Sequence, residues 1–315
     1  MKRKVIKQGN GTLTITLPKQ WTKDMNLTGN DEVDTIINEN NLVISPLSVG
    51  KKKSISINVD DFERLSLAKF LMACYEQGFD DMDLRFSKLK IKSWSHADED
   101  IIKVINFYVN RLIGFEVLSQ TKTSIKIGDI SQQYMKFDTI LSRIFFLIEE
   151  YLKDLITAMR SKDHNDLKNG ELRHDNITKL ISLASRIVHD SKTFSKFEVS
   201  NLFIILNLLD KITDFIRYSY RYTAKLNKVS KETIIFANKT FEFIEMYRSF
   251  FNKFDYKSIH LLDDLRGNIK KLFLTNANKF PKESVINAQF DALVEILHGA
   301  IKPRIAIELT KKSYA

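Results

Sequence analysis

Carboxylate residues spaced four positions apart occur in the C-terminal part of this 315-residue sequence. The clearest pair is Asp210 and Asp214, in NLFIILNLLDKITDFIRYSY. On an α-helix these two residues stack one turn apart, on the side opposite the apolar residues. Two such carboxylates repel each other unless a cation lies between them. The pair therefore indicates either a site for a hard cation or a solvated helix face.

A second pair, Glu171 and Asp175, has the same spacing in the preceding stretch GELRHDNITKLISLASR. On a helix, Asp175 faces away from the apolar residues. Glu171 lies to the side of these apolar residues, and His174 lies nearer the edge of the core. If the two helices are neighbours, their four carboxylates would repel one another unless a cation accepts their oxygens. A solvated face is again the alternative.

A third set of acidic residues lies near the C-terminus and is the weaker candidate. The stretch FDALVEIL aligns in register with LDKITDFI, which places Asp291 and Glu295 at the positions of the first aspartate pair. The stretch HLLDDLRGNIKKL supplies Asp264, but Asn268 stands where a further carboxylate is expected. One anionic ligand fewer weakens a site for a hard cation.

Residues that could perform catalysis are otherwise missing. The sequence contains no P-loop, no GxGxxG and no HExxH motif, and its six histidines do not have metal-ligand spacing on one helix. The single cysteine, Cys74, lies at an apolar helical position and is predicted to be a core residue. We therefore expect a protein that is not an enzyme. A metal-dependent enzyme is the least favoured alternative, because no base or nucleophile accompanies the carboxylates.

Basic residues predominate at the N-terminus, where the first 30 residues contain a single acid, Asp24. The six bases are Lys2, Arg3, Lys4, Lys7, Lys19 and Lys23. Such residues contact phosphates and supply most of the non-specific affinity for DNA. Arg3 is the only arginine among these six bases and is therefore the candidate for guanine recognition. The net charge of +10 is consistent with an anionic partner but does not identify one.

The composition indicates which elements carry these residues. Ten glycines and four prolines in 315 residues are few, so most of the chain is predicted to be helical, and the glycines place the strands towards the N-terminus. We expect an α+β fold that is mostly α. No apolar run reaches the ~18 residues of a membrane span, and no signal peptide is recognisable, so a cytoplasmic protein without membrane insertion is expected.

Four regions are predicted along the chain. Residues 1–48 have short alternating strands around a Gly9–Gly11 turn, a short helix after Pro18 and a hairpin through residues 39–41. Residues 51–130 have a β-α-β-α-β-β pattern. Residues 131–226 and 227–315 are each predicted to form a three-helix unit, with helices near 165–190, 198–226, 230–253, 256–278 and 282–310 after the first.

The first region is too small to fold alone. A unit of fewer than ~50 residues with short strands usually needs a metal, disulfides or a second subunit, and the sequence has neither a metal motif nor a disulfide in this region. Dimerisation is the remaining route, so we expect a homodimer formed through residues 1–48.

The residues of this region carry a family resemblance. KVIKQGNGTLTITLPKQW, followed by a Leu-x-Gly-x-Asp-x-Val turn and NNLVIS, resembles the AbrB/SpoVT swapped-hairpin DNA-binding domain of archaeal phosphate-uptake regulators. The resemblance implies an intertwined dimer in which paired hairpins share one barrel and present basic side chains to double-stranded DNA. Segments of the second region, RLIGFEV and YEQGFDDMDL, resemble the middle part of the same proteins, which suggests no chemistry.

The helical region resembles PhoU-family proteins, on the stretch LLDKITDFI. The family has three-helix repeats in which acidic residues of adjacent helices bind metal clusters at the surface. The resemblance implies a site for Mg, Mn, Fe or Zn ions formed by Glu171, Asp175, Asp210 and Asp214. Alignment by the apolar residues that follow instead puts His174 and Thr178 at the acidic positions of the second helix, so two registers remain open.

Together these patterns predict a DNA-binding regulator of phosphate uptake or a related response, in which a PhoU-like metal-binding region controls an AbrB-like head. The alternative is a PhoU-like interaction protein that does not bind DNA and modulates a transporter or a signalling kinase. Ligand control would require that the ligand binds one arrangement of the helices better than another.

Overall fold

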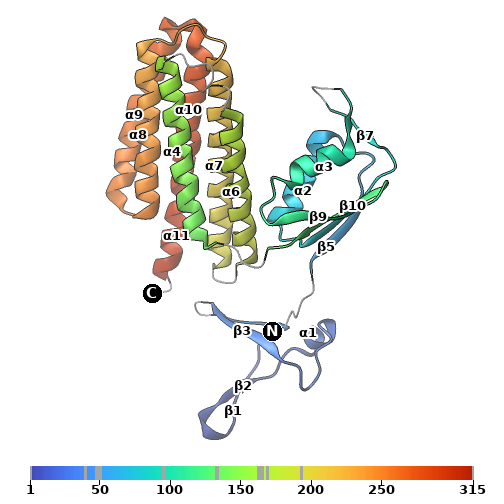
Figure 1. The fold of residues 1–315 in the computed structure, drawn as a ribbon. Helices are drawn as coiled ribbons and strands as arrows, with labels where there is room; N and C mark the ends of the chain where they lie inside the picture. Colours follow the sequence, from blue (N-terminus) through green and yellow to red (C-terminus); the bar gives the residue numbers. More distant parts are fainter. Residues whose placement is uncertain are drawn as a thin grey trace. The chain divides into compact units, whose positions relative to one another are not determined.

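The computed structural model describes residues 2–38, 41–46, 52–93, 97–131, 135–161, 167, 170–191 and 194–313. The described chain is mostly helical with small sheets, as predicted (Figure 1). It divides into two compact units, residues 1–51, which we name the head, and residues 52–315, which we name the body. None of the described helices is both long enough and apolar enough to span a membrane.

The head contains two antiparallel hairpins and a short helix. Strands β1 and β2 pair with Val5 opposite Ile15, around a single 3₁₀ turn in which Gly11 has a φ of +85°. A left-handed backbone of this kind favours glycine. The elements are β1 (Val5–Lys7), η1 (Gly9–Gly11), β2 (Leu13–Ile15), α1 (Lys19–Asp24), β3 (Val33–Asn38) and β4 (Asn41–Pro46). The predicted turn between β3 and β4 falls partly on residues 39–40, which lie outside the described residues.

The first part of the body is a small α/β segment, residues 52–131. Its four-stranded sheet has the order β5-β6-β10-β9, with β5 parallel to β6 and the other pairs antiparallel, and α2 and α3 lie on one face (Figure 1). This is the predicted β-α-β-α-β-β pattern, with a small β7–β8 hairpin added. The elements are β5 (Ser54–Asn58), α2 (Arg64–Glu76), β6 (Asp81–Arg85), β7 (Lys90–Ile91), β8 (Glu99–Asp100), α3 (Ile101–Val109), β9 (Phe115–Gln120) and β10 (Ser124–Asp129).

Long helices form the rest of the body. They are α4 (Phe137–Ser161), α6 (Gly170–Asp190), α7 (Lys196–Thr223), α8 (Lys231–Asn252), α9 (Tyr256–Lys279), α10 (Ser284–Gly299) and α11 (Ile301–Ser313), with η2 (Pro281–Glu283) before α10. The single helix predicted over 282–310 is wrong in this respect, because the structure has a break at Ala300. Pro303 has no N–H to donate to the carbonyl of Gly299, so the helix cannot continue through this turn.

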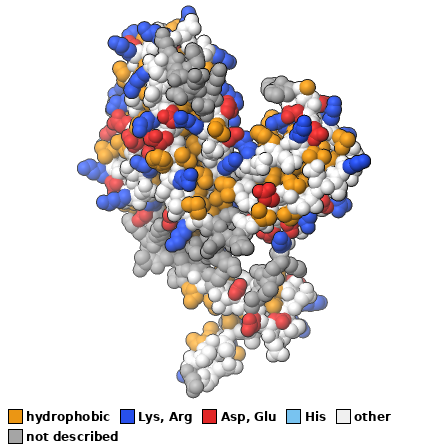
Figure 2. Space-filling view, viewed as in Figure 1, with side chains coloured by type: hydrophobic (Ala, Val, Ile, Leu, Met, Phe, Trp, Pro, Cys, Tyr) orange, Lys and Arg blue, Asp and Glu red, His pale blue; other side chains and the backbone are white. Residues whose placement is uncertain are grey.

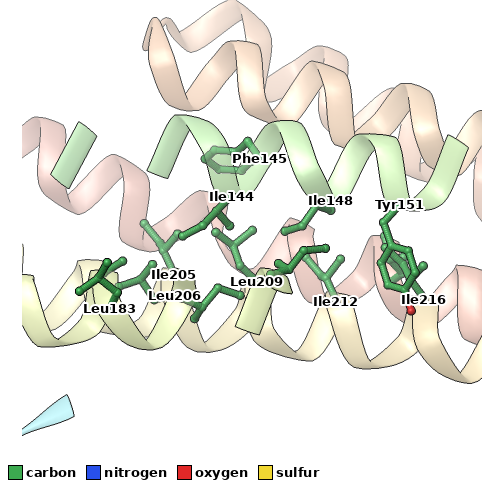
Figure 3. Packing of buried hydrophobic residues seen from close by; sticks show 14 of the residues in the cluster. Ile144, Phe145, Ile148, Tyr151, Leu183, Ile205, Leu206, Leu209, Ile212 and Ile216 are labelled. Carbon is green, nitrogen blue, oxygen red and sulfur yellow. The ribbon is translucent and has the colours of Figure 1, made fainter. Parts of the chain in front are cut away.

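The hydrophobic core runs through the whole helical part, and Figure 3 shows its portion between α4, α6 and α7. Ile144 and Ile148 of α4 point towards Leu209 and Ile212 of α7, and all four side chains are buried. A stripe of apolar residues on α4 has the i, i+3, i+4 spacing of an amphipathic helix, and all of its residues are buried. It consists of Leu141, Ile144, Phe145, Ile148, Leu152, Leu155, Ile156 and Met159. This packing leaves the polar edges of α6 and α7 to form the candidate site.

Candidate functional site

The carboxylates of α6 and α7 form what we name the first acidic face, made of Asp175, Asp210 and Asp214. Asp214 lies at its centre and accepts hydrogen bonds from three cationic groups. Its Oδ1 accepts from Nη2 of Arg217 at 2.6 Å and from Nε2 of His174 at 3.1 Å, and its Oδ2 accepts from Nζ of Lys211 at 3.2 Å. Burial acts to raise the pKa of Asp214, but these partners together lower that pKa to about 2.

His174 joins the two helices across this face. Its ring is buried, with Nε2 directed at Asp214 and Nδ1 placed 3.2 Å from Oδ1 of Asp175. Both neighbours are acceptors, so the ring satisfies them when both nitrogens carry protons. Burial acts to lower the pKa of His174, but the hydrogen bonds to the two carboxylates outweigh it and the pKa is raised. The face therefore holds a buried imidazole ring between two carboxylates, which favour its protonated form.

Arg111, which follows α3 in the α/β segment, supplies a further cation to this face. Its Nη2 donates to Oδ1 of Asp175 at 2.6 Å and lies 3.5 Å from the hydroxyl of Thr178. Both partners are residues of α6, and Arg111 is four-fifths buried. The α/β segment thus reaches the acidic residues that the sequence assigned to the helical region alone.

Asp210 has a different environment from that of Asp214. It is half-buried, and its nearest described cation is Lys211, with Nζ 3.9 Å from Oδ2. Burial and then the charge of Asp214 raise the pKa of Asp210. Glu76, at the end of α2, accepts a hydrogen bond from Ser182 of α6 at 2.9 Å. Its pKa is also raised, by burial and by the charge of Asp210, so two desolvated carboxyl groups lie near each other here.

Glu171 does not join the first acidic face. Its carboxylate pairs with Arg221, which lies nearer the C-terminal end of α7 than Asp214 does. The structure therefore brings three of the four predicted carboxylates together and separates the fourth. His174 is buried towards Asp214 of α7 and Thr178 lies near Arg111, so this face contains Asp175 from the first of the two registers considered for α6 and His174 from the second.

The second acidic face is formed by Asp291 and Glu295 of α10, and Asp264 of α9, the third residue predicted there, contacts neither of them. Lys270 of α9 donates to Asp291 at 2.7 Å, and Arg266 of α9 makes two hydrogen bonds to Glu295, at 3.0 and 2.6 Å. Asp264 lies 3.4 Å from the ring of His260 on its own helix and is exposed. Both faces thus have their carboxylates paired with basic side chains, but here these come from the neighbouring helix, whereas Lys211 and Arg217 of the first face lie on the same helix as Asp214.

The donor set of either face does not fit a metal cluster well. A hard cation needs several free oxygen ligands, whereas the oxygens of Asp175, Asp214 and Glu295 already accept from arginine or histidine. Within the described ranges, no group of three or more histidine, cysteine, aspartate or glutamate side chains is arranged to hold a metal ion. Metal binding stays a prediction of the sequence, and the observed contacts form an internal charge network instead.

Arg186 of α6 makes the other main contact between the α/β segment and the helices. It is 2% exposed, and its Nη1 donates to the carbonyls of Tyr75 and Phe79, both at 2.9 Å. Its Nη2 lies 3.0 Å from Oδ2 of Asp129 and 3.3 Å from Oδ1 of Asp80. The guanidinium therefore satisfies carbonyls at the C-terminal end of α2, where a positive charge is favoured.

The basic residues predicted to contact DNA are all exposed on the head. They are Lys2, Arg3, Lys4, Lys7, Lys19 and Lys23. Among the described residues of the head no side chain is buried, and large apolar side chains face solvent on both hairpins. Figure 2 shows several of these hydrophobic side chains on the visible face of the head. The exposed apolar residues are Val5, Ile6, Leu13, Ile15, Met25, Ile37, Leu42 and Val43.

Comparison with known proteins adds no family to these observations. The sequence matches no protein-family model and no curated protein. The resemblance to AbrB/SpoVT heads and PhoU repeats therefore stays a prediction. What the structure defines directly is a mostly helical α+β protein whose body has two acidic helix faces, both neutralised by basic side chains, and whose head lacks a core of its own in the described residues.

Proposed function

We propose that this protein is a dimeric, non-enzymatic DNA-binding regulator. In this proposal the head pairs with the head of a second copy and contacts the DNA backbone, and the body carries the regulatory input. The observation that carries the proposal is the contrast within the head, where exposed apolar side chains accompany six exposed bases and no described side chain is buried.

The apolar surface of the head supports pairing with a second copy. Ile37 is 82% exposed and Leu13 is 66% exposed, although both lie in strands with regular hairpin partners. A monomeric unit of this size leaves too little apolar surface buried to offset the conformational entropy that folding removes. A second head would cover these side chains and complete the shared barrel that the AbrB/SpoVT resemblance implies.

The charge of the head supports DNA as the ligand. The six bases are exposed, and each can contact a phosphate without giving up an ion pair with any residue that the structure describes. Such contacts release counterions, so the affinity should fall steeply as salt rises. Regulation of phosphate uptake or a related response is the biological role that the resemblance implies.

A gel-shift titration with paired charge reversals tests DNA binding. Arg3→Glu with Lys7→Glu should weaken binding to any duplex and reduce the salt slope by about one unit for each phosphate that is no longer neutralised. The matched control is Lys257→Glu with Lys302→Glu, two exposed lysines of the body, which alters the net charge equally. Equal weakening by both pairs, or no binding by the wild type, would favour the alternative of an interaction protein without DNA function.

Sedimentation of the full-length chain tests pairing of the heads. Leu13→Lys with Ile15→Lys should shift the protein to a lower association state, since the dimer would have to bury two charged groups in place of two apolar side chains. Leu274→Lys with Leu309→Lys is the control, because these body residues are similarly exposed. An association state that is unaffected by the head substitutions would exclude the head as the dimerising element.

A further inference from the structure

Two arginines make hydrogen bonds across the boundary between the α/β segment and the helices that follow it, one from each side. Arg186 extends from α6 to the carbonyls of Tyr75 and Phe79 at the end of α2. Arg111 extends in the opposite direction, from the end of α3 to Asp175 on α6. Each guanidinium is largely removed from solvent, and the hydrogen bonds described above for each cross this boundary.

The two arginines differ in what they bind. Arg186 binds mainly backbone carbonyls, which any α2 sequence would present. Arg111 binds a carboxylate of the first acidic face, where the residue types and spacing suggest a metal. With Arg111, the cations on this face are His174, Lys211 and Arg217, and together they contact Asp175 and Asp214 through the hydrogen bonds described above.

The second acidic face shows independently how such carboxylates are neutralised in this chain. There the cations Lys270 and Arg266 come from α9, the helix beside α10. On the first face, part of the positive charge comes from outside the helices, through Arg111. Burying a carboxylate is costly unless a cation accompanies it, so removal of Arg111 would leave Asp175 with fewer partners in a half-buried site.

We propose that the first acidic face is a docking surface for the α/β segment of the same chain, with Arg111 as the cation that this surface binds in place of a metal. The carboxylates hold the segment in position instead of holding a metal cluster. Because the α/β segment directly follows the head in the sequence, this contact sets how firmly the chain beyond the head is joined to the helices. The proposal does not depend on DNA binding.

Hydrogen exchange of the full-length protein, with charge swaps at the contact, tests the docking. Arg111→Asp and Asp175→Arg, each alone, place like charges together and should speed the exchange of protected α2 amides about tenfold or more, as expected when a largely buried ion pair is broken. The double variant R111D/D175R restores opposite charges and should return most of the protection. Arg111→Lys, which keeps the charge but not the planar geometry, should give an intermediate rate.

The control for these variants is Arg85→Asp, which removes an exposed ion pair with Asp83 on the same segment and should leave α2 exchange unchanged. If the single swaps behave like this control, the docking role of Arg111 is wrong. If both singles speed exchange and the double variant is no better than either, the pair does not act as a unit and the proposal is equally overturned.

Metal titrations of the same full-length protein test the second half of the proposal. Thermal melts of the wild type with Mg²⁺, Mn²⁺, Fe²⁺ or Zn²⁺ should show no rise in Tm, and elemental analysis of protein purified without chelators should find no bound metal. A rise in Tm that Asp210→Asn with Asp214→Asn abolishes would show a metal centre at this face and would overturn the assignment. Neither measurement involves DNA, so a negative gel shift leaves these outcomes unaffected.

Discussion

The two acidic faces of the body have the same carboxylate spacing but different neighbours. The first lies where the α/β segment meets α6, and its aspartates contact a buried histidine and an arginine from outside the helical unit. The second lies on α9 and α10, and its carboxylates contact exposed or half-exposed bases of the same unit. Spacing along one helix therefore identifies where carboxylates gather, while the elements packed against that helix decide what neutralises them.

The largest effect should come from Arg186, which belongs to neither face but joins α6 to the α/β segment. We expect Arg186→Ala to cost about 3–5 kcal/mol of the free energy of unfolding, because it leaves Asp129 and two backbone carbonyls buried without this cation. Urea denaturation of the full-length protein measures this. Arg266→Ala on the second face is the comparison. Equal losses for the two variants would show that the boundary with the α/β segment is not the more tightly held site.

A smaller loss is expected at the centre of the first face. Asp214→Asn should cost about 1–3 kcal/mol at neutral pH, since the neutral amide loses the charge that Arg217 and His174 contact, and its NH2 group cannot accept from Lys211 as Oδ2 does. The pKa of Asp214 is lowered from 3.8 to about 2. Its contribution is therefore present above pH 4 and lost as the pH falls towards 2. Urea denaturation at a series of pH values should show the difference between wild type and variant shrinking over this interval.

The opposite pH dependence is expected for Asp210 and Glu76. Their pKa values are raised in the folded protein, so their contribution is fully present below the ordinary carboxylate pKa and is lost as the pH rises through the raised values. Asp210→Asn should make the Tm less dependent on pH between the ordinary carboxylate pKa and the raised pKa of Asp210, and should leave the protein at least as stable at neutral pH. The control is Asp264→Asn, at an exposed side chain of α9, and an equal change of the Tm profile in both variants would contradict the assignment to Asp210.

The smallest effect should be found on the second face. Arg266→Ala removes two hydrogen bonds to Glu295, but both side chains are more than a third exposed or close to it. Exposed ion pairs of this kind contribute about 0–1 kcal/mol. The difference in Tm between Arg266→Ala and wild type should also shrink in high salt, because solvent ions screen the pair. A loss as large as that of Arg186→Ala would remove the distinction between the faces.

Much of the fold could be predicted from the sequence because the signals are local. The apolar spacing around Ile144 and Leu209 is a property of single helices, and so is the left-handed glycine at residue 78, which ends α2 with a φ of +72°. Pro303 also indicated the break before α11. The apolar spacing continues on both sides of it, so the sequence pattern still predicted a single helix.

The site was less predictable because its decisive contacts are not local. Arg111 and Asp175 are 64 residues apart, and nothing in the sequence around Arg111 marks it as the partner of a carboxylate. Glu76 and Arg186 were missed for the same reason. His174 did have a signal, since one of the two possible alignments of α6 placed it on the acidic face. Burial patterns of neighbouring helices, not residue spacing, decide between such registers.

The contact of Arg186 with α2 has a consequence for the order in which this chain folds. The arginine and the carbonyl of Tyr75 are 111 residues apart, so a long loop must close before the contact can form. During synthesis the whole α/β segment leaves the ribosome well before α6 does. Until α6 is made, the end of α2 lacks its contact with Arg186, and the face of the segment that α6 later covers stays accessible to chaperones and to other chains.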